Sequence, residues 1–319
     1  NMSETRARVA IVVGTRPEAI KQAPVVLAAH ASGLFDPVVV ATGQHDRPVV
    51  DALEAFGVAI HHALDASAVI DGTQAERFGW MLPGLDRVLA DAGVAAVVVQ
   101  GDTASALAGA LAGTWQQIPV VHLEAGLRSF DRANPFPEES YRKAIAALAD
   151  LHLAPTPMAL ANLRAEGIHG PRAVCIGNTV VDAGELSHAS AVAGGSSAAA
   201  PGGLRRVLVT IHRRENWGAP LTGVLAALER IVAAVPDIEV VIPVHPNPTV
   251  RAVIRTRLGG VDRVRIVEAL GHAAFIEQLA GSTLVLTDSG GVQEEAPAFG
   301  VPVLVLRETT ERPEAVAAG

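Results

Sequence analysis

Cysteine and aromatic side chains are scarce in this sequence of 319 residues, and each shortage excludes classes of protein. The single cysteine, Cys175, excludes an internal disulfide framework and a cysteine-rich metal site, and it fits a reducing, cytoplasmic setting. We interpret Cys175 as a small buried hydrophobic residue, because it lies in the apolar run 173–176. Aromatic residues make up 3%, which is too few for a platform that stacks single-stranded bases.

Basic residues and long apolar runs are also scarce. The formal net charge of −8 argues against nucleic acid and against an anionic membrane surface as partners. No run of about 18 uninterrupted apolar residues occurs, so the sequence holds no candidate membrane span. Hydrophobic residues nevertheless make up 50%, so the chain is not disordered, and its length predicts two domains with sizeable cores.

Short β-branched apolar runs alternate with longer amphipathic segments along the whole chain. We expect two series of strands, at residues 7–13, 37–41, 95–100, 119–123, 151–154 and 173–176, and then at 206–211, 239–244, 264–267, 283–287 and 302–306. Most are apolar throughout, which is typical of parallel strands covered on both faces. With helices such as 46–56, 75–92, 221–235 and 273–279 between them, they predict an α/β fold of doubly wound, Rossmann-like sheets.

One stretch of small residues, which begins at Ala189 and continues to Gly203, separates the two series. A stretch of this composition without periodicity is typical of a linker. We therefore expect an N-terminal domain at 1–185, a linker at 186–203 and a C-terminal domain at 204–319, with a central cleft. Ligands of such folds bind beyond the carboxyl ends of the strands, so residues there are the candidates for function.

In the first domain, cations and carboxylates follow the expected strands. Arg16 and Lys21 begin a helix and suit an anion, although a solvated helix start explains them equally well. Asp102 either caps the next helix or takes part in chemistry. Glu124 ends an apolar strand, where an unpaired charge is costly, and the structural alternative is an ion pair with Arg128 or Arg132.

Two prolines then deliver Glu138 and Glu139 to a helix start, where the helix dipole alone explains one carboxylate. Asp102, Glu124 and Glu138 together place three carboxylates at one domain edge. Crowded carboxylates raise one another's pKa, which favours general acid and base catalysis.

The second domain carries a basic loop and a glycine-rich turn. His212 and Arg213 follow its first strand and suit a phosphate, the alternative being a loop held by ion pairs. His245 ends another strand, where a packed side chain is the commoner role. Ser289, Gly290 and Gly291 open a helix whose N–H groups suit a diphosphate, and Glu295 suits ribose hydroxyls. These residues predict a nucleotide-linked substrate.

Several common motifs are missing. No transition-metal ligand spacing occurs, no order of Ser, His and Asp stands out, and no Gly-x-Gly-x-x-Gly follows the first strand. We therefore expect neither a metal nor a cofactor.

Seven motifs in register resemble the bacterial non-hydrolysing UDP-N-acetylglucosamine 2-epimerases over almost the whole chain: 14–21 (GTRPEAIK), 101–103 (GDT), 122–128 (HLEAGLR), 135–139 (PFPEE), 210–216 (TIHRREN), 287–297 (TDSGGVQEEAP) and 310–314 (TERPE). The resemblance implies a GT-B-type architecture that closes on a UDP-sugar, and a homodimer. It also implies reversible conversion of UDP-GlcNAc to UDP-ManNAc by anti-elimination of UDP and re-addition to a 2-acetamidoglucal.

The resemblance also assigns roles to residues. The catalytic residues it implies are Asp102, Glu124, Glu138 and His212, without deciding which carboxylate takes the C2 proton. The substrate-binding residues it implies are Arg16, Lys21, Arg142, Arg213, His245, Phe275, Ser289, Gly290, Gly291, Glu295 and Arg312. Phe275 would pack against uracil.

Some positions depart from the family pattern. Tyr141 stands before Arg142 where asparagine is frequent, and Gln22 replaces a methionine. Gln44, Gln74, Glu138, Arg213 and His245 match parts of a second, allosteric UDP-GlcNAc site, but Arg47 and Thr73 replace two of its usual residues. Family members also continue beyond residue 319, so we expect a C-terminal tail to be missing.

The alternatives are a 2-epimerase for another UDP-2-acetamido sugar (a diacetamido or uronic acid derivative), a hydrolysing epimerase, a GT-B glycosyltransferase and a non-catalytic UDP-sugar sensor. Retention of Asp102, Glu124, Glu138 and His212 together argues against the sensor.

Overall fold

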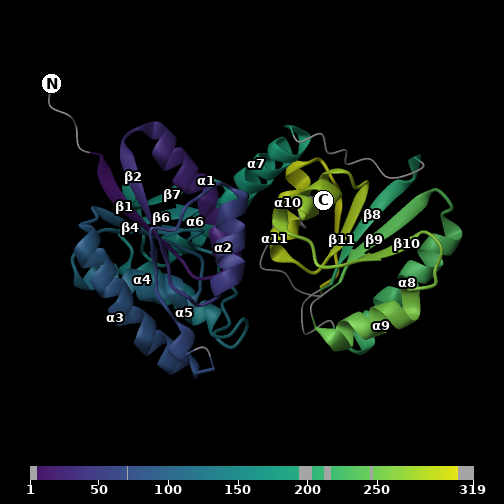
Figure 1. The fold of residues 1–319 in the computed structure, drawn as a ribbon, viewed down its shortest axis with the longest axis horizontal. Coiled ribbons are helices and arrows are strands. Elements are labelled where there is room, and N and C mark those ends of the chain that lie inside the picture. Colours follow the sequence, from purple (N-terminus) through teal and green to yellow (C-terminus); the bar gives the residue numbers. More distant parts are fainter. Residues whose placement is uncertain (1–5, 70, 194–202, 212–216, 245–246, 308–319) are drawn as a thin grey trace. The chain divides into compact units, whose positions relative to one another are not determined.

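The computed structural model describes residues 6–69, 71–193, 203–211, 217–244 and 247–307. The chain divides into two compact units, Asn1–Ala183 and Gly184–Gly319. Each unit is built around its own parallel β-sheet with helices on both faces (Figure 1). The predicted α/β class and the two Rossmann-like, doubly wound sheets of a GT-B-type protein are confirmed.

The sheet of the first unit has seven strands in the order β3-β2-β1-β4-β5-β6-β7. The strands are β1 (Ala7–Val13), β2 (Phe35–Ala41), β3 (His62–Ala63), β4 (Ala96–Gln100), β5 (Val120–Leu123), β6 (Leu151–Ala154) and β7 (Ala173–Cys175). All neighbouring strands pair in parallel; Ile11 of β1, for example, lies opposite Val39 of β2 and Val98 of β4.

The helices of this unit are α1 (Arg16–Ser32), α2 (Asp46–Ala55), α3 (Gln74–Ala92), α4 (Ala104–Trp115), α5 (Glu138–Leu148), α6 (Pro157–Ala165) and α7 (Thr179–Ala193), which continues into the second unit, with 3₁₀ turns at Ser67–Val69 and Gly170–Arg172. Alternate residues of one strand point to opposite faces of the sheet. Val12 of β1 therefore packs in the cluster that contains α3, α4 and α5, whereas Ile11 packs in the cluster with α1 and α2 (Figure 1).

The second unit repeats this plan with five strands in the order β10-β9-β8-β11-β12. Its strands are β8 (Arg205–Thr210), β9 (Ile238–Pro243), β10 (Val264–Val267), β11 (Leu284–Thr287) and β12 (Val303–Val305), and its helices are α8 (Ala219–Ala234), α9 (Pro248–Leu258), α10 (His272–Ala280) and α11 (Gly290–Ala298). Val209 packs in the cluster with α8 and α9, and Leu208 in the cluster with α10 and α11 (Figure 1).

The structure differs from the sequence expectations at three places. Cys175 is exposed rather than buried, because β7 is an edge strand that pairs with β6 alone. The segment 186–203 is not a linker throughout, since α7 runs on to Ala193, and 194–202 lie outside the described residues. The strand β3 was not predicted, because two residues are too few to show an apolar pattern.

Each sheet has one point at which the chain reverses the direction in which it adds strands. In the first unit this point lies between β1 and β4, and in the second between β8 and β11. The loops after such strands diverge, and the crevice they leave is where ligands of open α/β sheets bind. The turns that begin at Gly14, at Gly101 and at Asp288 follow three of these strands, β1, β4 and β11.

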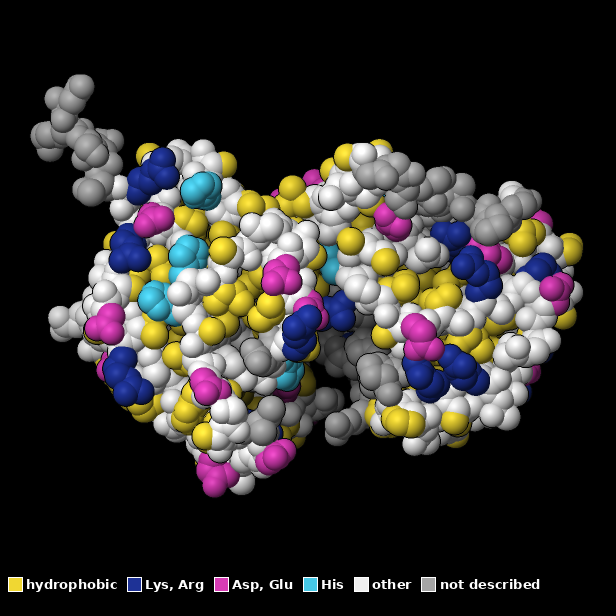
Figure 2. Space-filling view, in the orientation of Figure 1, with side chains coloured by type: hydrophobic (Ala, Val, Ile, Leu, Met, Phe, Trp, Pro, Cys, Tyr) yellow, Lys and Arg dark blue, Asp and Glu magenta, His cyan; other side chains and the backbone are white. Residues whose placement is uncertain are grey.

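Acidic and basic side chains are intermixed on the face of each unit that Figure 2 shows. Several charged side chains of the second unit form ion pairs, such as Arg257 with Glu229 at 3.0 Å and Arg205 with Asp237 at 2.9 Å. Within the described part of the chain, no helix is long and apolar enough to cross a bilayer.

The loop after β5 is packed closely against α6 at Gly126. The φ of Gly126 is +90°, and a Cβ atom there would lie 2.2 Å from the carbonyl oxygen of Ala159 on α6. Gly167 has a similar φ of +86° but open space around it. We expect Gly167→Ala to lower the free energy of unfolding by about 1 kcal/mol through backbone strain alone, and Gly126→Ala by about 3 kcal/mol or more.

Urea unfolding of both variants checks this expectation. Equal destabilisation by the two substitutions would show that the loop gives way around the new methyl group, and would contradict the tight packing.

Candidate active site

Glu124 follows β5 directly, and donors hold both of its carboxylate oxygens. It is a buried non-glycine residue with a φ of +61°. Lys21 Nζ of α1 lies 2.6 Å from Oε2, and the Gln100 amide at the end of β4 donates to the same oxygen. Asn178 Nδ2, from the loop after β7, donates to Oε1 at 3.1 Å. Donors from three separate segments thus converge on one carboxylate, an arrangement that satisfies its ionised form.

The ion pair of Glu124 with Lys21 takes the place of the pair with Arg128 or Arg132 that was the structural alternative. Arg128, one of the two expected partners, instead forms a paired contact with Glu166, at 2.9 and 2.6 Å. Arg132, the other, is exposed. The cation beside Glu124 is Lys21, which the sequence indicated as an anion contact.

Asp102 forms the second charged group of this edge. Thr103, not Asp102, caps α4, because the Thr103 side chain accepts from the N–H of Ala106 at 3.0 Å. Asp102 is therefore free of the capping role, and Arg142 Nη2 lies 2.6 Å from its Oδ2. The preceding residue, Gly101, has a φ of +70°, and a Cβ there would lie 3.9 Å from Oε2 of Glu124. The turn that carries Asp102 thus approaches Glu124 closely.

Glu139 holds Arg142 in place from the other side. Its Oε2 lies 3.1 Å from Nη1 of Arg142, and it accepts the backbone N–H groups of Ser129 and Phe130 at 3.0 and 3.2 Å. Of the two carboxylates at the start of α5, Glu139 is therefore structural.

Glu138 is the other carboxylate at the start of α5. Its Oε2 atom is buried, and no described residue forms a hydrogen bond with it. Tyr141 lies one turn further along the helix, and burial, together with the charge of Glu138, raises the pKa of its hydroxyl. A buried oxygen without a partner is costly, and this one has an acceptor position that no described residue uses.

Glu18 is a buried carboxyl group that joins two loops of the site. Its Oε2 accepts the N–H groups of Gly14 and Thr15 at 3.1 and 2.7 Å, and Thr103 donates its hydroxyl to Oε1 at 2.7 Å. Burial outweighs these hydrogen bonds and raises its pKa to about 7. The loops after β1 and β4 are thereby fixed to one another. The sequence analysis did not single out Glu18, although it is the N3 residue of a capping box that begins at Thr15.

His122 forms a hydrogen bond with the turn at Gly101, which precedes Asp102. It is fully buried, and burial lowers its pKa to about 4, so the ring is neutral near pH 7. Its Nε2 lies 2.8 Å from the carbonyl oxygen of Gly101. Because a carbonyl can only accept, the neutral ring carries its proton on Nε2 and holds the turn before Asp102.

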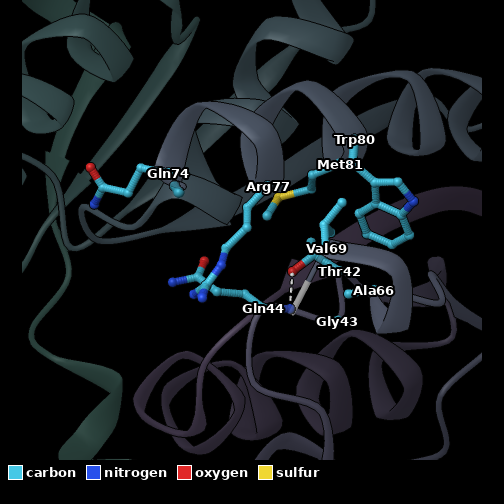
Figure 3. Close-up of a pocket in the computed structure, with 10 residues that line it drawn as sticks. Thr42, Gly43, Gln44, Ala66, Val69, Gln74, Arg77, Trp80 and Met81 are labelled. Carbon is cyan, nitrogen blue, oxygen red and sulfur yellow. Dashed lines mark hydrogen bonds between the residues drawn. The ribbon is translucent and has the colours of Figure 1, made fainter. Parts of the chain in front are cut away.

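A cavity of about 120 Å³ lies beside this edge, between α3 and the loop after β2 (Figure 3). Gln44 and Gln74, two of the residues expected in a second nucleotide site, both line it, although Gln74 points away from Arg77 and Gln44. Arg77 reaches from α3 toward Gln44 and supplies a cation that the sequence analysis missed. Thr73 is occupied as the cap of α3, and Arg47 pairs with Asp51 at 2.9 Å.

In the second unit, the loop after β11 opens α11. The N–H of Ser289 donates to the Thr287 hydroxyl at 2.9 Å, and the Ser289 side chain forms no capping bond. Like any helix start, the first turn, with Gly290 and Gly291, presents N–H groups that lack a helical acceptor. Phe275 of α10 is half-buried against the core, and Glu295 of α11 is nearly fully buried.

The remaining predicted site residues, His212, Arg213, His245 and Arg312, lie outside the described residues. Arg16 is exposed at the start of α1. Among the described side chains, no group of three or more His, Cys, Asp and Glu residues could hold a metal ion.

Sequence reasoning missed Gln100, Asn178 and Glu139 as partners of the predicted residues. A signal existed for Gln100, since it is the polar end of an apolar strand. Asn178 offered a weaker one, because it follows β7 by three residues, and its contact with Glu124 depends on tertiary structure.

Comparison with known proteins identifies related sequences and structures. The sequence model of a family described as UDP-N-acetylglucosamine 2-epimerase matches residues 27–319. A UDP-N-acetylglucosamine 2-epimerase of Bacillus subtilis is 43% identical over 317 residues, which cover 98% of this chain and 82% of the relative. One from Escherichia coli K12 is 39% identical over 320 residues, covering 98% and 85%. The crystal structure of a UDP-GlcNAc 2-epimerase from Neisseria meningitidis bound to UDP-GlcNAc is similar with a TM-score of 0.88 and 36% identity, covering 98% of this chain and 86% of that one.

Glu18 and Glu76 allow a matched test of burial, because both are the N3 residue of a capping box. The pKa of buried Glu18 is raised to about 7, whereas hydrogen bonds to Thr73 lower the pKa of exposed Glu76. Between pH 4.5 and 7 the folded chain keeps the Glu18 proton that the unfolded chain loses. The Glu18 contribution to the unfolding free energy therefore falls as pH rises through this window, by on the order of 3 kcal/mol at most.

Urea unfolding at pH 5 and pH 8 compares the wild type with Glu18→Gln and Glu76→Gln. We expect the stability of Glu18→Gln relative to the wild type to improve on going to pH 8. For Glu76→Gln it should not improve, since a lowered carboxyl pKa stabilises the fold above the unfolded pKa and is lost as pH falls. If the stability of both variants relative to the wild type improved at pH 8, the raised pKa of Glu18 would not be the cause, and its assignment to burial would be contradicted.

Proposed function

The chain belongs to the UDP-N-acetylglucosamine 2-epimerase family, and from that premise we propose that it interconverts UDP-GlcNAc and UDP-ManNAc without hydrolysis, by eliminating UDP and adding it back. The observation that carries the proposal is the environment of Glu124, a buried carboxylate that follows β5 at the carboxyl ends of the strands. Lys21, Gln100 and Asn178 fix its position. Asp102, with Arg142, and the unpartnered oxygen of Glu138 supply further acidic groups there.

In the elimination, a carboxylate removes the proton from C2 of the sugar. The C2–H electron pair forms the C1=C2 double bond, and the bond from C1 to the phosphate oxygen breaks with its electrons on UDP. The products are a 2-acetamidoglucal and UDP, and no oxidant or water enters. Re-addition of UDP at C1 and delivery of a proton to the opposite face of C2 invert the centre, so two acidic groups are needed, drawn from Asp102, Glu124 and Glu138.

Cations and N–H groups stabilise the departing diphosphate. We assign Arg16, His212 and Arg213 to the charge that develops on the phosphate, and Ser289 with the first turn of α11 to its binding. Glu295 binds the ribose, and Phe275 packs against uracil. These assignments rest on the family motifs. They are supported by the start of α11 and by the half-buried ring of Phe275 in the second unit.

Incubation of the protein with UDP-GlcNAc, followed by proton NMR, tests the activity. We expect the anomeric signal of UDP-ManNAc to appear until equilibrium, without accumulation of free ManNAc and UDP. Stoichiometric release of free ManNAc would assign the chain to hydrolysing enzymes, and an unchanged spectrum would refute the proposed substrate.

Glu124→Gln tests the acid–base role. The amide has the shape of the carboxylate but cannot take up a proton, so we expect turnover to fall by about 10²–10⁴-fold. The affinity for UDP should change by less than about threefold, because the nucleotide contacts are assigned to other residues. Glu54→Gln on the exposed surface of α2 is the matched control and should keep full turnover. Turnover of Glu124→Gln near the wild-type rate would remove Glu124 from the chemistry.

A further inference from the structure

A chain of hydrogen bonds within the second unit ends on Glu295. His272, the first residue of α10, places Nε2 3.3 Å from Oε1 of Glu295. The hydroxyl of Ser187, on α7, lies 3.1 Å from Nδ1 of the same ring. All three side chains are largely buried, with Ser187 7% exposed and Glu295 6% exposed. We call Ser187, His272 and Glu295 the α7–α10–α11 relay.

The carboxylate of Glu295, the last member of this relay, determines which atoms of the relay carry protons. An ionised carboxylate can only accept, so Nε2 of His272 carries the proton that Glu295 receives. In the neutral ring Nδ1 is then an acceptor, and Ser187 donates its hydroxyl to it. Of the two carboxylate oxygens, Oε1 is used in this way, whereas no described residue donates to Oε2. The relay therefore fixes the orientation of Glu295 and leaves one oxygen for a further donor.

The first member of the relay is itself held by packing. A Cβ atom on Gly184, one turn before Ser187, would lie 3.3 Å from the ring of Phe299 and 3.5 Å from Ile276. His188 contacts the Phe299 ring edge-on, with 5.4 Å between the ring centres. The part of α7 that follows Ala183 is thus closely packed on α10 and on the end of α11, and the Ser187 hydroxyl has a fixed position.

The order Ser, His, Glu also occurs in hydrolases, but this geometry does not suit a nucleophile. Ser187 is buried inside a helix rather than exposed on a sharp strand-to-helix turn. The order of contacts instead suits a relay that orients its terminal carboxylate.

We propose that His272, held by Ser187, is a positioning residue for Glu295, and that this relay determines how strongly the protein distinguishes a ribonucleotide from one without ribose hydroxyls. The inference rests on the proposed function, in which Glu295 binds the ribose. Ribose hydroxyls donate to an ionised carboxylate, and a carboxylate whose rotamer is fixed before binding loses less side-chain entropy when the nucleotide arrives.

Isothermal titration with UDP and with 2′,3′-dideoxy-UDP measures this discrimination directly. The variants are Glu295→Gln, His272→Leu, His272→Gln and Ser187→Ala. The matched control is Ser282→Ala, which removes a buried hydroxyl that bonds to the carbonyl of Gln278 at 2.6 Å, outside the relay. Circular dichroism confirms that each variant is folded.

We expect the wild type to bind UDP about tenfold or more tightly than the dideoxy analogue. His272→Leu should weaken UDP about tenfold and leave the dideoxy analogue within about twofold. His272→Gln, whose amide N–H can donate in place of Nε2, should recover UDP affinity to within about threefold. Ser187→Ala should lose part of the discrimination, and Ser282→Ala none.

Equal weakening of both nucleotides by His272→Leu would show a merely structural role and overturn the proposal. So would unchanged discrimination in that variant. If the wild type epimerises UDP-GlcNAc but Glu295→Gln keeps full discrimination, the relay and the ribose assignment of Glu295 are overturned while the proposed epimerisation stands. Absence of UDP binding by the folded wild type overturns both.

Discussion

The ion pair between Lys21 and Glu124 is the interaction on which the candidate active site of the first unit depends. Its side chains are only 13% and 6% exposed, so neither charge is well hydrated, and removing either partner would leave the other buried and uncompensated. The polar groups of Gln100 and Asn178 complete the solvation that water would otherwise supply. Because these four residues come from α1, β4, the loop after β5 and the loop after β7, the pair also fixes these segments relative to one another.

Two other buried carboxylates on this edge, Glu18 and Glu139, are held in structural hydrogen bonds, unlike Asp102 and Glu138, to which the proposed function gives a role in chemistry. Glu18 ties the loop after β1 to Thr103, and Glu139 ties Arg142 to the backbone at Ser129 and Phe130. The neutral ring of His122 supports the turn at Gly101. A site built in this way is rigid before the ligand binds, which is what electrostatic stabilisation of a transition state requires. The hydrogen bond from His272 holds Glu295 of the second unit in a similar way.

The sequence predicted most of the strands because parallel strands buried on both faces are short, β-branched apolar runs, and here they alternate with longer amphipathic segments. It also indicated Asp102 and Glu124 as candidate site residues from their places after such strands, with a helix cap and an ion pair as their structural alternatives. Their partners could not be predicted. Lys21 and Glu124 are 103 positions apart and meet only because β1, β4 and β5 are neighbours in the sheet. Cys175 was misplaced for the same reason, since its exposure depends on β7 being an edge. Whether Asp102 or Thr103 caps α4 depends on the backbone conformation of one turn, which composition does not specify.

Proton removal at C2 separates the proposed elimination from transfer or simple binding. It is tested most directly by incubating the wild-type protein with UDP-GlcNAc in deuterium oxide and following the C2 position by NMR. Elimination and re-addition predict deuterium at C2 of the UDP-ManNAc formed and, as the reaction reverses, of the recovered UDP-GlcNAc. Formation of UDP-ManNAc that keeps its C2 hydrogen throughout, or no change in either sugar, would contradict it.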